Sequence, residues 1–144
     1  MATLAGIDLL GKFRAGCDSQ GNVGKRFLDF IQEYFNVNQK EADIIYELRN
    51  SLLHSFGLHS RKYKFILLES KYKKFIETIT IKSAPGMLAK INVWKLYKKF
   101  IKAISKYYNA LKKHKLLREN FNDMYTYYGI SRHGPLKKIQ KFFM

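Results

Sequence analysis

Carboxylates are scarce in this sequence. Its 144 residues include 11 Asp and Glu against 27 Lys and Arg, which gives a net charge of +16 and a pI near 9.9. Such an excess of positive charge favours a polyanionic partner, nucleic acid ahead of an anionic membrane. The alternative is a drift of the composition toward Lys, because Asn, Ile and Tyr are plentiful as well.

The sequence has a single cysteine and few histidines. The single cysteine, Cys17, excludes an internal disulfide and fits a reducing compartment. No signal peptide and no apolar run long enough to span a bilayer are recognisable, so we expect a cytoplasmic protein that does not use the membrane as a partner. His59, His114 and His133 have no neighbours at metal-ligand spacing. We therefore expect neither a metal site nor a cofactor.

The stretch Glu41–Ser60 carries two opposed stripes when it is projected as a helix at about 100° per residue. One stripe is apolar and predicts a buried face: Ile45, Leu48, Leu52 and Phe56. The opposite stripe is polar and contains no lysine, which is unusual in so basic a chain: Asp43, Glu47, Asn50 and His54. Arg49 lies between the two stripes, nearer the apolar one.

These residue types suit phosphodiester chemistry. An imidazole such as that of His54 gives or takes a proton near neutral pH. The guanidinium of Arg49 can hold a phosphate, and the amide of Asn50, one turn before His54, can orient the ring or the phosphate. The structural alternative is that His54 merely ends the helix and that Arg49 and Glu47 form an ordinary surface pair.

The segment Arg49–His54, RNSLLH, resembles the signature of the HEPN superfamily, in which an Arg is followed by a polar residue and then by a His. The flanking segments Ile7–Phe13 and Val23–Phe27 strengthen the resemblance. It implies metal-independent cleavage of RNA through attack by the 2′-hydroxyl, as in a toxin or defence effector. The predicted catalytic residues are then Arg49, Asn50, His54 and Glu47. Some HEPN toxins carry a Tyr that a partner modifies two residues after the His, where this chain has Phe56.

The remaining sequence predicts a mainly α, HEPN-like helical bundle with a small inserted β-hairpin. The hairpin is expected from Tyr63–Leu68 and Phe75–Lys82, with a turn at Pro85-Gly86. The longest helix is expected at Asn92–Lys115. Its predicted buried stripe consists of Tyr97, Phe100, Ile101, Ile104, Tyr108 and Leu111. We expect one domain over residues 1–130 and a basic tail over 131–144.

The lysines of that helix form the expected contact with RNA: Lys95, Lys99, Lys102, Lys106 and Lys113. The plainer interpretation of the same residues is a solvated face. Cleavage benefits from one group that takes a proton and another that gives one, and the motif offers a single histidine. We therefore expect a homodimer built around the motif helix, and leave open a neutralising partner protein.

Two other functions remain open at this stage. One is a non-catalytic HEPN module that binds RNA or a protein. The other is a nucleotide-binding regulator, although Gly21–Lys25 departs from the phosphate-loop pattern, since Ser19 stands in place of the first Gly and Arg26 in place of Ser or Thr.

Overall fold

The computed structural model describes residues 2–54, 57–69, 71–82 and 86–133. These ranges form five helices and three strands, and the chain is mainly helical, as expected. The elements are α1 (Ala2–Ala15), α2 (Val23–Tyr34), α3 (Gln39–His54), β1 (Tyr63–Leu68), β2 (Ile76–Thr80), β3 (Met87–Asn92), α4 (Val93–Lys113) and α5 (Lys115–His133). Among the helices in these ranges, none has the length and apolar character needed to cross a membrane.

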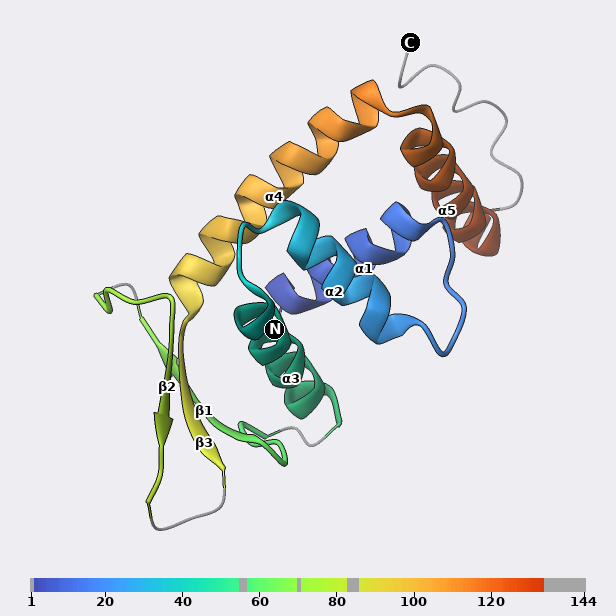
Figure 1. Ribbon diagram of the computed structural model, residues 1–144. Helices are drawn as coiled ribbons and strands as arrows, with labels where there is room; N and C mark the ends of the chain where they lie inside the picture. Colours follow the sequence, from blue (N-terminus) through green and yellow to red (C-terminus); the bar gives the residue numbers. More distant parts are fainter. Residues whose placement is uncertain (1, 55–56, 70, 83–85, 134–144) are drawn as a thin grey trace.

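Helix α4 runs along the molecule and connects its parts (Figure 1). The sheet lies at the N-terminal end of α4, and α5 folds back at the other end to pack against α1. Helices α1 and α2 pack against one another and against α4, while α3 packs on α2. The core where they meet is apolar, and its largest fully buried hydrophobic side chains are Ile7, Phe27, Phe30, Ile31, Ile44, Ile45, Leu48 and Ile91.

The close crossing of α1 and α2 depends on a glycine. A Cβ atom at Gly11 would lie 2.9 Å from the carbonyl oxygen of Arg26 in α2, closer than real Cβ contacts. The absence of a side chain therefore lets the two backbones approach. This contact sets the position of α1, including Asp8 one turn earlier, relative to the rest of the core.

The sheet corrects the expected hairpin. Strands β1 and β2 do not pair with one another, because both pair with β3, which the sequence analysis had not assigned as a strand. Strand β3 lies parallel to β1, with Phe65 opposite Ala89, and antiparallel to β2. Ala89 and Ile91 are fully buried in this central position. The turn predicted at Pro85-Gly86 falls partly outside the described residues, since Pro85 is not described.

The predicted buried stripe of α4 is wrong for most of its members. The residues that face the core are Leu96, Ala103, Tyr107 and Leu111, with Phe100 partly buried. Tyr97, Ile101, Ile104 and Tyr108 are instead 38–51% exposed. Apolar residues occupy two neighbouring faces of α4, and the helical period alone does not tell which face meets the other helices.

Helix α5 extends past the expected end of the domain. It continues to His133, whereas the basic tail was expected to start at residue 131. Met124 is buried, and Leu117 and Phe121 pack on the core. Residues 134–144 of the predicted tail lie outside the described residues.

Asn92 joins the sheet to α4 and is fully buried. Its side-chain oxygen accepts a hydrogen bond of 2.9 Å from the backbone N–H of Lys95, which caps the helix. Its amide nitrogen donates to the carbonyl oxygens of Glu69 (3.1 Å) and Tyr72 (2.7 Å). One side chain thus fixes the start of α4 and the connection between β1 and β2.

We predict that Asn92→Ala lowers the free energy of unfolding by about 2–4 kcal/mol, because it removes the helix cap and two further hydrogen bonds of a fully buried side chain. Asn109→Ala on the exposed side of the same helix is the matched control and should change the free energy by less than about 0.5 kcal/mol. Urea unfolding followed by circular dichroism measures both. Equal stability of the two variants would contradict this role of Asn92.

Candidate functional site

The two stripes predicted for α3 are present. Ile45 and Leu48 are buried, and Leu52 packs against the core, while Phe56 lies outside the described residues. The polar stripe faces away from the core, with Asp43 and His54 exposed and Glu47 and Asn50 partly exposed. We call these four residues the α3 polar stripe. The helix starts with a capping box, in which the Asn38 side chain accepts from the Glu41 N–H and Glu41 accepts from the Asn38 N–H.

Arg49 is held by an ion pair that the sequence analysis did not anticipate. Its Nε donates to the Asp8 carboxylate of α1 at 2.8 Å, and the two side chains are only 12% and 19% exposed. Its Nη1 donates to Oδ1 of Asn50 at 2.9 Å. Asp8 therefore holds Arg49, and Arg49 in turn fixes the side-chain amide of Asn50. Because Oδ1 of Asn50 is the acceptor of this bond, the NH2 group of the amide can donate to another partner.

His54 ends α3 and is exposed. Within the described part of the chain, its ring makes no hydrogen bond or ion pair. It lies one turn after Asn50 on the same stripe, so a single bound group can reach both side chains. Arg49, by contrast, bonds to Asp8 of α1. Asn50 therefore shares the polar stripe with His54, while its side-chain oxygen bonds to Arg49 beside the stripe.

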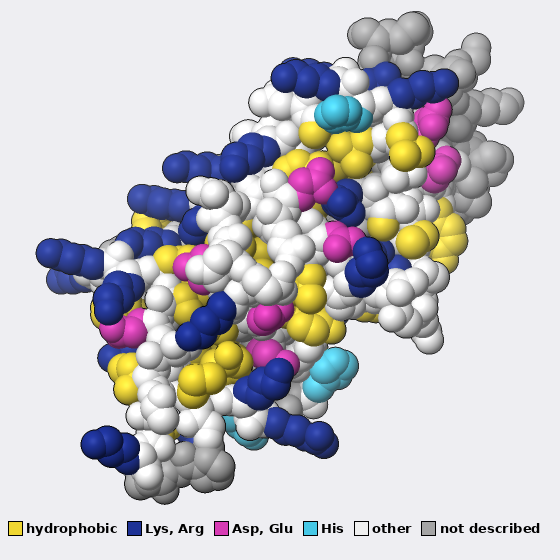
Figure 2. Space-filling view, in the orientation of Figure 1, with side chains coloured by type: hydrophobic (Ala, Val, Ile, Leu, Met, Phe, Trp, Pro, Cys, Tyr) yellow, Lys and Arg dark blue, Asp and Glu magenta, His cyan; other side chains and the backbone are white. Residues whose placement is uncertain are grey.

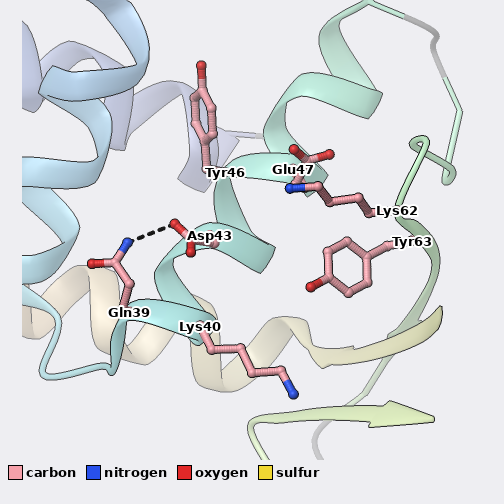
Figure 3. A pocket seen from close by; sticks show the side chains of 7 residues that line it. All are labelled: Gln39, Lys40, Asp43, Tyr46, Glu47, Lys62 and Tyr63. Atoms are coloured by element: carbon pink, nitrogen blue, oxygen red, sulfur yellow. Dashed lines mark hydrogen bonds between the residues drawn. The ribbon is translucent and has the colours of Figure 1, made fainter. Parts of the chain in front are cut away.

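Glu47 belongs to a separate open pocket of about 510 Å³. The pocket lies between α3 and the start of β1, and its lining is polar except for the tyrosine rings: Gln39, Lys40, Asp43, Tyr46, Glu47, Lys62 and Tyr63. Figure 3 shows the Lys62 amine reaching toward Glu47, and Asp43 turned toward Gln39, whose amide donates to it at 2.8 Å. Asn50, His54 and Arg49 do not line this pocket. Glu47 thus lines this pocket together with Asp43, whereas the other predicted catalytic residues do not.

The five lysines expected to contact RNA all lie on α4, where Figure 2 shows Lys and Arg side chains along the edge of the molecule. Lys102, Lys106 and Lys113 are exposed and make no hydrogen bond or ion pair with any described residue. Helix α4 has no Asp or Glu of its own that could neutralise them. These three lysines form an open cationic row, here called the α4 lysine row.

The other two lysines have structural contacts. The Lys99 amine donates to the carbonyl oxygens of Phe35 (3.4 Å) and Asn36 (3.1 Å), which supports the end of α2. Partial burial lowers the pKa of Lys99. Lys95 donates to the carbonyl oxygen of Lys73. Removing either side chain would therefore alter packing as well as charge.

Asp8 contacts the candidate site but was not among the residues predicted from the sequence. The sequence offers one indication, since Asp8 is the one acidic residue in the apolar segment Met1–Phe13. A carboxylate that such a helix buries needs a cationic partner. Its partner is 41 residues away in sequence, so no local pattern identifies it. Among the described residues, no three His, Cys, Asp or Glu side chains are grouped so as to hold a metal ion.

No family model, curated protein or solved structure matches this chain.

We predict that Asp8→Asn lowers the free energy of unfolding by about 1–3 kcal/mol, because it leaves the largely buried guanidinium of Arg49 without a countercharge. Asp43→Asn on the exposed face of α3 makes the same chemical change and should cost less than about 0.5 kcal/mol. Thermal and urea unfolding of both variants measure the difference. If Asp8→Asn proves as stable as Asp43→Asn, the ion pair does not hold Arg49 in solution.

Proposed function

We propose that this protein is a metal-independent endoribonuclease of HEPN type that acts through the α3 polar stripe. The observation that carries the proposal is the chain of contacts from Asp8 through Arg49 to Asn50, which lies one helical turn before the exposed His54 on the same stripe. An oriented amide donor next to a free imidazole is an arrangement that can bind a phosphate oxygen and transfer a proton. The resemblance of Arg49–His54 to the HEPN signature supports the same chemistry.

The proposed reaction needs no group beyond the RNA and the protein. His54 takes the proton of a ribose 2′-hydroxyl, and the resulting oxyanion attacks the adjacent phosphorus. The bond from phosphorus to the 5′-oxygen breaks, and that oxygen receives a proton to become a hydroxyl. The products are a 2′,3′-cyclic phosphate and a 5′-hydroxyl end. DNA lacks the attacking group, so it is not a substrate.

Arg49 has a positioning role in this proposal. Its Nε and Nη1 are already bonded to Asp8 and Asn50, so it acts mainly by orienting the amide and by adding positive charge behind it. The second proton-transfer group would come from a second copy of the chain. A homodimer around α3 would place two His54 rings near one phosphate.

The α4 lysine row supplies the expected attraction for the RNA backbone. Lys102, Lys106 and Lys113 lie on one face of α4, where neutralised phosphates would release counterions. The net charge of +16 adds a long-range attraction to any polyanion. Binding of RNA is therefore expected even where cleavage is absent.

One observation favours a second candidate, a module that binds RNA without cutting it. The charge of Arg49 is compensated by Asp8, and the Arg49 side chain is only 12% exposed. A phosphate would have to compete with Asp8 for a direct contact with Arg49. Salt-dependent binding to RNA without any cleavage would identify this second function.

We predict that His54→Ala abolishes RNA cleavage while leaving RNA affinity and melting temperature nearly unchanged. The ring is exposed, so its loss opens no cavity, and it contributes no fixed charge beside 27 Lys and Arg. His59→Ala, an exposed histidine outside α3, is the matched control and should cut like the wild type. Digestion of a labelled RNA in EDTA, with sedimentation of the same samples, measures activity and assembly. A His54→Ala protein that cuts as fast as His59→Ala would exclude His54 as the proton-transfer group, and an active monomer would exclude the dimer.

We also predict that reversing the charge of Lys102, Lys106 and Lys113 to Glu weakens RNA binding and flattens its salt dependence. The slope of log affinity against log salt concentration should fall by about two units for a single strand if all three contact phosphates. Reversing Lys64, Lys71 and Lys82, exposed lysines between α3 and β3, changes the net charge equally and is the control. If both triple variants lose the same affinity and slope, the attraction is general and the α4 lysine row is not a specific contact.

A further inference from the structure

Helix α4 carries a line of large apolar side chains that the rest of the described structure leaves partly exposed. Trp94 is 47% exposed, and the other four members are 38–51% exposed: Tyr97, Ile101, Ile104 and Tyr108. Single exposed hydrophobic residues are ordinary, but a continuous line of them marks an interaction surface. We call these five residues the α4 stripe.

The α4 stripe is distinct from the face that α4 buries in the core. At about 100° per residue, its centre lies roughly 100° around the helix from Leu96, Ala103, Tyr107 and Leu111. It lies roughly 140° from the α4 lysine row on the same projection. Helix α4 thus has three faces, one packed in the core, one cationic and one apolar and open.

We propose that the α4 stripe is the docking surface for an acidic amphipathic helix of a partner protein. The spacing supports a helical partner, because successive members are separated by three, four, three and four residues. This is the repeat that a helix uses to pack along a second helix. The stripe is also only about 80° wide, the width of a helix–helix seam and narrower than the sector of 100° or more that a broad apolar face covers.

The charge around the stripe selects an acidic partner. Helix α4 contains seven lysines and neither Asp nor Glu. Two of these lysines flank the stripe directly, since Lys98 lies over the ring of Trp94 at 5.5 Å and Lys112 over that of Tyr108 at 4.3 Å. Carboxylates on the edges of an incoming helix would meet these amines. A second copy of α4 would bring another seven lysines to the same contact instead.

The composition of the stripe disfavours the other polyanions as its occupant. Ile101 and Ile104 form its centre and have no aromatic face on which a base of single-stranded RNA could stack. An anionic bilayer would suit Trp94 and the lysines, but it favours the wider apolar sector described above. The α4 stripe lies on a different helix from the proposed catalytic stripe on α3, so its proposed role does not depend on RNA cleavage.

Trp94 provides a direct readout, because it is the only tryptophan in the chain and belongs to the stripe. The probe is a labelled helical peptide without tryptophan that has Leu at the seam positions and Glu at the flanking positions. Two control peptides carry Lys in place of the flanking Glu, or the same residues in scrambled order. We expect saturable binding of the acidic peptide alone, with a shift of Trp94 emission to shorter wavelength.

The variant Ile101→Ser/Ile104→Ser tests the surface. Both residues are exposed, so the fold should be kept, and affinity for the acidic peptide should fall by at least about tenfold. Leu9→Ser/Leu116→Ser removes the same number of exposed apolar side chains outside the stripe and should bind like the wild type.

Several outcomes would overturn the proposal. These are an absence of saturable binding, equal binding of a control peptide, or unchanged affinity in Ile101→Ser/Ile104→Ser. The proposal also fails if the acidic peptide does not bind while this variant loses self-association, binding to phosphatidylglycerol vesicles or binding to single-stranded RNA. Those results would assign the stripe to a second copy, to a bilayer or to RNA, respectively.

Discussion

The ion pair between Asp8 and Arg49 is the contact on which the proposed site depends. It links α1 to α3 across 41 residues of sequence and is largely shielded from water. A guanidinium in that position needs a countercharge, and carboxylates are scarce in this chain. The same guanidinium bonds to Asn50 and so fixes the direction of the amide next to His54. The packing of α1 therefore affects the orientation of Asn50 in the α3 polar stripe.

Local sequence patterns predicted the two faces of α3 but not the pairing of the strands. The opposed stripes of α3 are visible in the sequence, because a helix between core and solvent imposes its period on the residue types. The pairing of β1 and β2 with β3 could not be read in this way. Strand segments can be recognised one at a time, whereas their order in a sheet depends on contacts between segments far apart in sequence.

The placement of the candidate site residues was likewise predicted only in part, because some of their contacts join segments far apart in sequence. Asn50 and His54 share an exposed face as expected, and Arg49 leans toward the core as expected. The pairing of Asp8 with Arg49 and the pocket that Glu47 lines together with Lys62 come from tertiary packing. On α4, a single apolar stripe was expected where two apolar faces exist, because Leu96 and Tyr107 also lie on a helical repeat. Only the neighbouring helices decide which face is buried.

Charge and apolar surface are divided between separate faces of the same molecule. The α3 polar stripe contains no lysine, while α4 has seven lysines and no carboxylate. The lysines proposed to attract RNA therefore lie on α4, and the group proposed for proton transfer lies on α3. This separation explains why loss of His54 and loss of the α4 lysine row should affect different steps.

The ends of RNA products made in EDTA test the assignment of the α3 polar stripe most directly. A defined oligonucleotide is incubated with the protein, and the new ends are identified by mass spectrometry. Attack by the 2′-hydroxyl predicts 2′,3′-cyclic phosphate and 5′-hydroxyl ends, and no cut in the same oligonucleotide with 2′-deoxyribose throughout. Absence of cleavage, cleavage only with added Mg²⁺, 5′-phosphate ends, or cleavage of the deoxy substrate would contradict it.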